Sequence, residues 1–369
     1  MKRRALLRAG ALAGSLSLAG CSNLIETRAV GVPPVPENRP DGVYYPSHVE
    51  GMAMAGMASS GDYAVGLMYS YPHRFWNVNG DSVSLTDIES NDAVHLMASV
   101  WDPETKTVLP DTGLSLEIYR DDSLVTQEAI YPMLSQPMGF HYGANFALEG
   151  DGTYSVRLSV GAVSTRRTGD FVGRFADPET VEIPFEYSEA KKNEISFERF
   201  DEQVATPGAV QPMSMEMLPN AFAPLESNLP GTVLGSALSN DARFVVTALE
   251  SPPEGVESDG GTSETSRAAG DGTYLAVSAR TRYNRMVIPA MGLSGVLTRD
   301  GEAVSDGAFD RTLDPELGYH YGAVVDGVES GDELTLLVDV QPQTARHEGY
   351  ETAFGGLMDG MSDVTIQVP

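Results

Sequence analysis

The sequence predicts an all-β protein that contains two tandem antiparallel β-sandwiches. A shift of 179 residues places 92–175 over 271–354 without a gap, and the stretch His-Tyr-Gly-Ala at 141–144 then coincides with a copy at 320–323. Segments such as 93–100 and 153–160 are short and rich in β-branched or aromatic residues, and Gly, Asp and Pro separate them. Because each copy shows short strand-like segments separated by turns and no long helical periodicity, it is expected to fold as a sandwich.

The N-terminal 21 residues predict an export signal. A twin arginine at 3–4 precedes a weakly apolar stretch at 9–18, which is too short to span a bilayer as a helix. The stretch ends in Leu-Ala-Gly-Cys at 18–21, which is typical of a lipobox, and Cys21 is the only cysteine in the chain. We therefore expect residues 1–21 to be a twin-arginine-type lipoprotein signal, with a lipid on Cys21 anchoring the protein at the outer face of the membrane. The alternative is an ordinary buried thiol beside a chance pair of arginines.

Composition sets the boundaries of the remaining domains. Residues 22–57 are expected to form a linker, because a proline-rich run at 32–40 favours a stiff, extended chain. The first sandwich is placed at 58–200 and the second at 238–369. A segment rich in Pro and Met at 201–237 is expected to link them, and a Gly-, Ser- and Glu-rich loop at 252–272 is expected to be mobile.

The charge balance argues against a nucleic-acid partner and indicates a high-salt environment. The chain has 52 acidic and 24 basic residues, a formal net charge of −28, and a pI near 4.4. Such a surface repels nucleic acid. Acidic excess spread along the whole chain, with very few lysines, is typical of a protein that works in very high salt, so we expect a halophilic archaeal cell surface. A hydrophobic content of 41% argues against a wholly disordered chain.

Histidine and methionine supply the candidate metal ligands. His95 and Met97 lie two residues apart on a predicted strand, so their side chains share a face. Met133 and His141 flank a turn-like segment at 134–140. Imidazole and thioether groups together suit copper and accept ferrous iron or zinc. The alternative is that both methionines are core packing and that His141 is a hydrogen-bonding residue of a turn.

The segment at 131–145, Tyr-Pro-Met-Leu-Ser-Gln-Pro-Met-Gly-Phe-His-Tyr-Gly-Ala-Asn, resembles the signature of the periplasmic iron-transport protein family. That resemblance implies an immunoglobulin-like sandwich that binds a metal ion through one Met and the His of this segment and an earlier His-Leu-Glu strand. Here that strand reads His95-Leu96-Met97, so Met97 stands where the family has Glu. The family's later Arg-His turn corresponds to Arg167-Thr168 in the first copy and to Arg346-His347 in the second.

The resemblance further implies a shared site. Family members act as homodimers in which the late His can reach the partner's site, and a tandem duplication could fold as that dimer within one chain. We therefore expect one composite site formed by His95, Met133, His141 and His347. The mirror-related residues Tyr274, Thr312, His320 and Thr168 would then form no site. The alternative is that the second copy has drifted and His347 is a solvent-facing loop residue.

Two further groups of residues are weaker candidates. His73, within an aromatic segment at 71–76, and His320 are possible members of a second metal site, although packing at a sandwich edge also accounts for the aromatic segment. Closely spaced methionines precede each copy and can hold Cu(I), but they are also adaptable apolar residues. They are Met52, Met54, Met57, Met213, Met215 and Met217.

The sequence thus predicts a lipid-anchored, extracytoplasmic protein that captures ferrous iron or copper, with zinc also acceptable, for a membrane permease. The alternative function is a structural or adhesive surface lipoprotein whose sandwich has lost metal binding. An enzyme is not expected, because the sequence has no phosphate-binding loop, dinucleotide fingerprint, His-Glu-x-x-His motif or Gly-x-Ser-x-Gly elbow.

Overall fold

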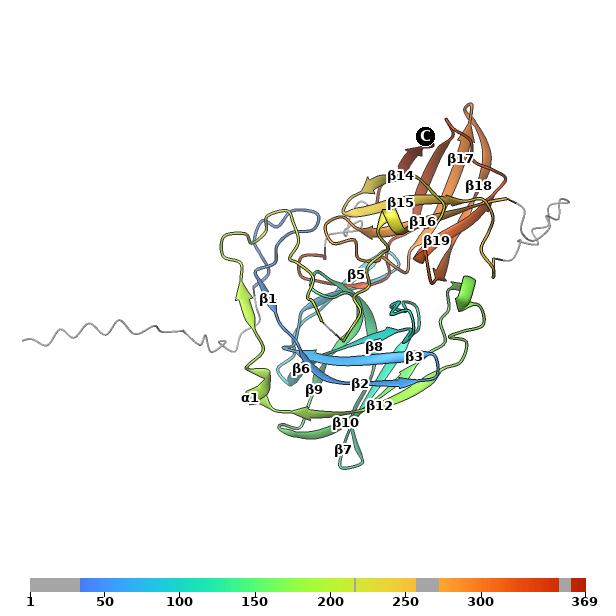
Figure 1. Ribbon diagram of the computed structural model, residues 1–369. Coiled ribbons are helices and arrows are strands. Elements are labelled where there is room, and N and C mark those ends of the chain that lie inside the picture. The colour runs from blue at the N-terminus through green and yellow to red at the C-terminus, as the bar shows by residue number, and fades with distance from the viewer. Residues whose placement is uncertain (1–33, 216, 257–271, 352–359) are drawn as a thin grey trace, which may run out of the picture. The chain divides into compact units, whose positions relative to one another are not determined.

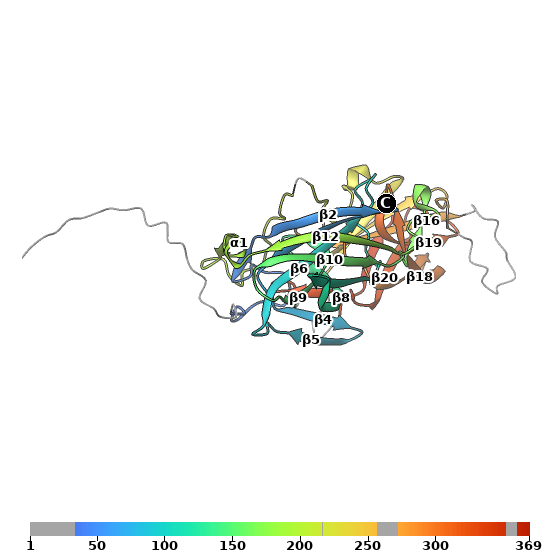
Figure 2. The ribbon, with the colours of Figure 1, turned by 90° about the horizontal axis from the view of Figure 1, so that it is seen from below.

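The computed structural model describes residues 34–215, 217–256, 272–351 and 360–369, and residues 33–369 form one compact unit. The predicted signal, Cys21 and most of the loop at 252–272 lie outside the described residues. Among the residues that the structure describes, no helix is long and apolar enough to cross a membrane. The prediction of an all-β protein with two tandem sandwiches is confirmed (Figures 1 and 2).

The first sheet is antiparallel along its main path, and its ends meet. A Cβ placed on Gly56 of the first strand in this order would lie 2.6 Å from Ile183 Cγ2 of the last, so the sheet curls towards a barrel. In spatial order its strands are β2 (Ala53–Ser60), β3 (Tyr63–Ser70), β6 (Asp92–Trp101), β9 (Gly139–Ala147), β8 (Ser123–Ser135), β7 (Leu114–Arg120), β10 (Gly152–Val160) and β12 (Glu179–Tyr187).

The second sheet repeats this strand order. A Cβ on Gly235 would lie 2.9 Å from Ile366 Cγ2, so its first and last strands also meet. In spatial order the strands are β14 (Thr232–Ser239), β15 (Ala242–Leu249), β16 (Thr273–Thr281), β19 (Gly318–Val325), β18 (Glu302–Asp314), β17 (Gly292–Arg299), β20 (Glu333–Val340) and β22 (Val364–Gln367).

Each sandwich donates a short strand to the sheet of the other. β11 (Arg166–Arg167) leaves the first sandwich and pairs in parallel with β18 of the second. β21 (Ala345–His347) leaves the second sandwich and pairs in parallel with β8 of the first, between β8 and β4 (Phe75–Asn79). The hairpin partner of β4 is β5 (Ser82–Thr86). This exchange brings residues of the second sandwich to the face of the first.

The strand residues follow the period of two that a half-buried sheet requires. In β10, Tyr154, Val156, Leu158 and Val160 are buried while the residues between them face outwards. Every residue of β3 is buried, so both faces of this strand are covered. The remaining elements are β1 (His48–Glu50), which pairs with β13 (Phe197–Arg199), and the short helices η1 (Gly169–Phe171), α1 (Glu189–Lys192) and η2 (Glu226–Asn228).

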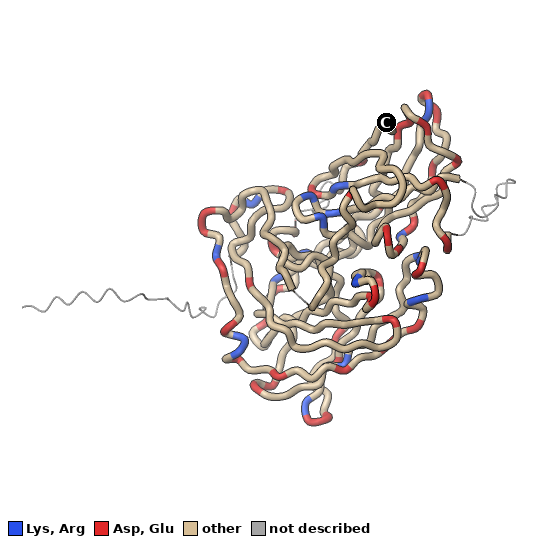
Figure 3. The backbone as a smooth tube through the Cα atoms, in the orientation of Figure 1, with Lys and Arg blue, Asp and Glu red and all other residues tan. Residues whose placement is uncertain are grey.

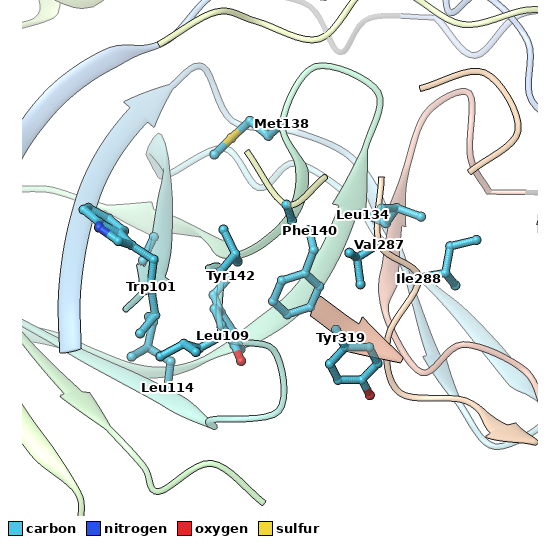
Figure 4. Packing of buried hydrophobic residues seen from close by; sticks show 14 of the residues in the cluster. Trp101, Leu109, Leu114, Leu134, Met138, Phe140, Tyr142, Val287, Ile288 and Tyr319 are labelled. Carbon is cyan, nitrogen blue, oxygen red and sulfur yellow. The ribbon is translucent and has the colours of Figure 1, made fainter. Parts of the chain in front are cut away.

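One apolar core runs through both sandwiches. Leu134 and Phe140 of the first belong to the same buried cluster as Val287, Ile288 and Tyr319 of the second (Figure 4). Burial of this continuous apolar surface holds the two copies together through the hydrophobic effect. Acidic residues are spread over both sandwiches rather than gathered in one segment (Figure 3).

The strand boundaries differ from those expected from composition. β1 and the start of β2 lie within the segment at 22–57 that was predicted to be a linker, and β14 begins at Thr232, before residue 238. The sequence Ala-Met-Ala-Gly-Met at 53–57 has little β-propensity, so its pairing with the buried strand β3 decides its conformation. The predicted linker at 201–237 is also anchored, since Leu218, Ala221 and Ala223 are buried.

Candidate metal centre

Three neighbouring strands of the first sheet present the candidate ligands on one face. Met133 of β8 lies directly opposite His141 of β9, and His95 of β6 lies directly opposite Asn145 of β9. His141 and Asn145 are four residues apart on one strand, so both side chains point to the same side of the sheet. The register of β8, β9 and β6 therefore gathers these side chains into one patch.

Gly143 occupies the centre of this patch and leaves room for it. A Cβ built there would lie 2.7 Å from His95 Nε2, closer than real Cβ contacts, and 3.0 Å from Met133 Sδ, which is tighter than most of them. The absence of a side chain at 143 lets an imidazole nitrogen and a thioether sulfur approach the same point from opposite sides. A metal ion needs this convergence of donor atoms.

His347 of the second sandwich completes the cluster. β21 places Ala345 beside Met133, so that His347 follows at the edge of the patch, and its Nε2 lies 3.2 Å from Met133 Sδ. A turn closed by the hydrogen bond from Tyr350 N–H to the His347 carbonyl follows directly. One ligand atom from each of His95, His141 and His347 lies within 4.8 Å of the other two.

Hydrogen bonds fix two of the imidazole rings so that Nε2 faces the cluster. His95 Nδ1–H donates to Asn145 Oδ1 at 2.8 Å, and His141 Nδ1–H donates to the Gly139 carbonyl at 3.0 Å. The Nε2 atoms of both rings are buried and have no hydrogen-bond partner within the described residues. Metal-binding histidines are held in this way, because a proton on Nδ1 leaves the Nε2 lone pair for the ion.

Burial keeps these imidazoles neutral. It lowers the pKa of His95 from 6.5 to about 3 and that of His141 to about 4. The pKa of His347 is also lowered well below 6.5, by burial first and then by the neighbouring His141 and His95. A neutral imidazole is the form that binds a metal ion, so proton competition at neutral pH is weak.

Apolar side chains close one side of the cluster. Phe75, Met133 and Ala345 form a buried apolar group of their own. The Phe75 ring centre lies 6.0 Å from that of His95 and 6.4 Å from that of His347. This wall excludes water from part of the site and strengthens any electrostatic contact within it.

Of the other sequence candidates, His73 and Met97 lie next to the cluster. The His73 ring centre is 4.8 Å from that of His95. Met97 is buried opposite Gly143 and lines a pocket together with His73 and His347. His73 and His320 do not come together, because His320 belongs to the mirror position in the second sandwich.

The mirror position is filled by a tyrosine. The Tyr274 hydroxyl lies 2.9 Å from His320 Nε2, and a Cβ on Gly322 would lie 1.8 Å from that hydroxyl oxygen. His320 Nδ1–H donates to the Gly318 carbonyl, so Nε2 accepts a hydrogen bond from the Tyr274 hydroxyl. The hydroxyl of Thr168, which corresponds to His347, donates to Asp314 Oδ2 at 2.8 Å. Tyr274 and His320 hydrogen-bond to each other and Thr168 bonds to Asp314, so their polar atoms already have protein partners.

The closely spaced methionines fall into exposed and packed residues. Met54 and Met57 are on β2, where they are 38% and 42% exposed, so they are surface residues of a strand. Met52 and Met215 pack against the apolar core, and Met213 donates its backbone N–H to the Pro137 carbonyl. The apolar interpretation therefore fits Met52 and Met215, whereas Met54, Met57 and Met217 are exposed.

Sequence reasoning missed Gly143, Asn145 and Phe75. A signal existed for the first two, because they follow His141 at intervals of two on a predicted strand and therefore share its face. None existed for Phe75, whose position depends on the pairing of β4 with a strand from the second sandwich.

Comparisons with known families give one match in each sandwich. Residues 88–198 match the family of Fe2+ transport proteins. This match confirms the resemblance inferred from 131–145, and its range includes His95, Met133 and His141 but not His347. Residues 227–366 match a family described as a domain of unknown function (DUF7350). A comparison with curated proteins found no match.

Solved structures similar to the chain each correspond to about a third of it. FetP from uropathogenic E. coli strain F11 is 20% identical, covers 37% of this chain and 96% of its own, and gives a TM-score of 0.28. A copper-bound variant of P19 from Campylobacter jejuni is 20% identical, covers 37% of this chain and 98% of its own, and gives a TM-score of 0.31. A copper-bound FetP variant is 22% identical, covers 37% of this chain and 97% of its own, and gives a TM-score of 0.29.

Proposed function

We propose that this protein is an extracytoplasmic carrier that binds one transition-metal ion per chain through His95, Met133, His141 and His347. One observation carries the proposal. Two deeply buried histidines, each oriented by a hydrogen bond at Nδ1, point Nε2 at a small space that His347 and a thioether also reach. Burying the His95 and His141 imidazoles without a ligand is costly, because their Nε2 atoms lose water without gaining a partner.

The donor set favours borderline and soft ions. Three imidazoles and one thioether suit Cu(I) and are acceptable for Fe(II), and zinc is compatible with the imidazoles. The match of 88–198 to Fe2+ transport proteins supports Fe(II), and the thioether of Met133 supports copper. We propose Fe(II) or copper as the cargo.

The arrangement supports transport rather than catalysis. An ion held by neutral side chains exchanges with another acceptor by replacing one ligand at a time, and no protein group undergoes a chemical change. His347 is the least buried of the three histidines and lines a pocket, so it is the ligand best placed to exchange first and last. We therefore propose a binding protein and not an enzyme.

The proposed location rests on the N-terminal sequence alone. The twin arginine at 3–4 and the lipobox-like sequence ending in Cys21 favour export and lipid anchoring at the outer face of the membrane. From there the protein would deliver its ion to a membrane permease. The acidic composition favours function in high salt.

The test is metal titration of the chain from Ser22 onward, in concentrated sulfate because chloride binds soft metals. Fe(II), Cu(I), Cu(II) and Zn(II) are titrated into the wild type, His141→Ala and the matched control His320→Ala. We expect high-affinity binding by the wild type that falls by more than about 100-fold in His141→Ala, because one of four ligands is lost. His320→Ala should bind as the wild type does. Absence of binding by the folded wild type refutes the proposed function.

A further inference from the structure

A pocket lies beside the candidate metal centre and reaches it. Its lining includes His347 and Met97, and also His48, Glu50 and His73. Its volume of about 80 Å³ exceeds the roughly 10–15 Å³ that a single water molecule needs, so a partly hydrated ion can enter. The pocket therefore provides a path from solvent to His347.

A carboxylate lies between two imidazoles in this pocket. Glu50 Oε2 is 3.4 Å from His73 Nδ1, and Glu50 Oε1 is 3.8 Å from His48 Nε2. The Glu50 side chain is only 1% exposed, whereas those of His48 and His73 are 11% and 19% exposed. The carboxylate is thus at the bottom of the group, and the imidazoles face the opening.

Each of these side chains is held by its own element. His48 and Glu50 are two apart on β1, so they share a face, and the His48 ring stacks on Phe197 of β13 with ring centres 5.1 Å apart. His48 Nδ1 is hydrogen-bonded to Ser47 Oγ at 2.8 Å, which leaves Nε2 towards Glu50. The backbone of His73 is bound on both sides by the side chain of Asn145.

We propose that His48, Glu50 and His73 form an outer site that takes a divalent metal ion from solvent and passes it to the buried centre. Two imidazoles and a carboxylate are ligands typical of Zn(II) and Fe(II). Tetrahedral coordination with bonds of about 2.1 Å separates ligand atoms by about 3.4 Å. Glu50 Oε2 lies at this distance from His73 Nδ1, whereas His48 Nε2 lies 3.8 Å from the other carboxylate oxygen, so binding of one ion by all three residues requires a movement of the His48 side chain.

The outer site adjoins the inner one. The His73 ring centre lies 4.8 Å from that of His95 and 5.3 Å from that of His347. Asn145 Oδ1 accepts hydrogen bonds from both His95 Nδ1–H and the His73 backbone N–H, so one amide positions a residue of each site. Transfer by ligand exchange between them rests on the proposed function of the inner site, whereas binding at the outer site does not. His48, Glu50 and His73 lie outside the range that matches the Fe2+ transport family.

The test is calorimetric titration of the purified chain with Zn(II), together with stopped-flow measurement of Zn(II) uptake. Wild type is compared with Glu50→Gln, His73→Gln and His141→Ala. Glu198→Gln serves as a matched control, because it removes an exposed carboxylate from the strand that pairs with β1. We expect the wild-type chain to bind two Zn(II) ions, one more weakly than the other. Glu50→Gln and His73→Gln should lose the weaker ion and take up Zn(II) at least about 10-fold more slowly.

The variants separate the two proposals. His141→Ala should retain the weaker equivalent and lose the tighter one. If His141→Ala leaves all binding intact while Glu50→Gln loses an equivalent, the outer site stands and the proposed inner function fails. If Glu50→Gln and His73→Gln are folded and bind Zn(II) with the stoichiometry and uptake rate of the wild type, the outer site is refuted whatever His141→Ala shows.

Discussion

The substitution Gly143→Ala tests the geometry of the metal centre without removing any ligand. The added methyl group would lie 2.7 Å from His95 Nε2 and 3.0 Å from Met133 Sδ. Both distances are shorter than the about 3.5–4.0 Å at which non-bonded atoms pack well. The methyl group would therefore take the space between two donor atoms that an ion must reach together.

The expected magnitudes follow from this overlap. Overpacking of a buried site costs about 1–3 kcal/mol of unfolding free energy, and the cost should fall near the lower end because the atoms met are tips of side chains. Metal affinity should fall further. Disturbing only the partners that orient ligands costs about 10–100-fold, so an obstruction between the ligands should cost more than about 100-fold, or about 2.8 kcal/mol.

The assay is competition for the ion between the protein and a chelator of known affinity, with thermal unfolding of the ion-free protein measured in parallel. Gly327→Ala is a neutral control, because no atom lies within 4 Å of its added Cβ. Gly322→Ala is a second control that overpacks the mirror position against Tyr274. It should lower stability without changing metal affinity. Wild-type affinity in a folded Gly143→Ala protein would falsify the convergence of His95 and Met133 on one ion.

Three further predictions concern ligand orientation, metal preference and pH. Asn145→Ala removes the acceptor of His95 Nδ1–H and should lower metal affinity by about 10–100-fold in the same competition assay. An unchanged metal affinity would speak against a role of Asn145 in positioning His95. Met133→Leu keeps the side-chain volume, should cost less than about 1.5 kcal/mol of stability, and should lower the ratio of Cu(I) to Zn(II) affinity; an equal fall for both ions would contradict the sulfur as a ligand. Because burial lowers the pKa of His95 to about 3 and of His141 to about 4, unfolded chains take up protons below pH 6.5 while the folded protein does not. The unfolding free energy of the ion-free protein should thus fall from pH 6.5 towards 4, by about 2 kcal/mol per histidine at pH 5, and urea midpoints that do not fall between pH 7 and 5 would rule this out.

Much of the candidate site could be predicted from the sequence because its parts are local. Met133 and His141 flank one hairpin turn, and His95 lies on a strand whose period places it on a definite face. The position of His347 could be inferred only from the internal repeat together with the resemblance to a dimeric family. The structure places all four side chains together, and metal binding by them stays a prediction.

The remaining features depend on contacts between residues far apart in sequence. Glu50 lies 3.4 Å from His73, and its strand β1 pairs with β13, which begins at Phe197, a pairing that no local pattern indicates. The cover that Phe75 provides depends on β4 pairing with β21, which begins at Ala345. The start of β2 was missed because its Gly, Ala and Met residues have no strand preference of their own. Their extended conformation depends on pairing with β3.

The most direct test of the central claim is anomalous diffraction, at the metal absorption edge, from crystals of the chain loaded with one equivalent of Cu(I) or Zn(II). We predict one dominant peak per chain, at about 2.0–2.1 Å from the Nε2 atoms of His95, His141 and His347, with Met133 Sδ as the fourth neighbour. A dominant peak bound by His320, or a peak at His95 and His141 from which His347 stays out of bonding distance, would contradict a site shared between the two sandwiches.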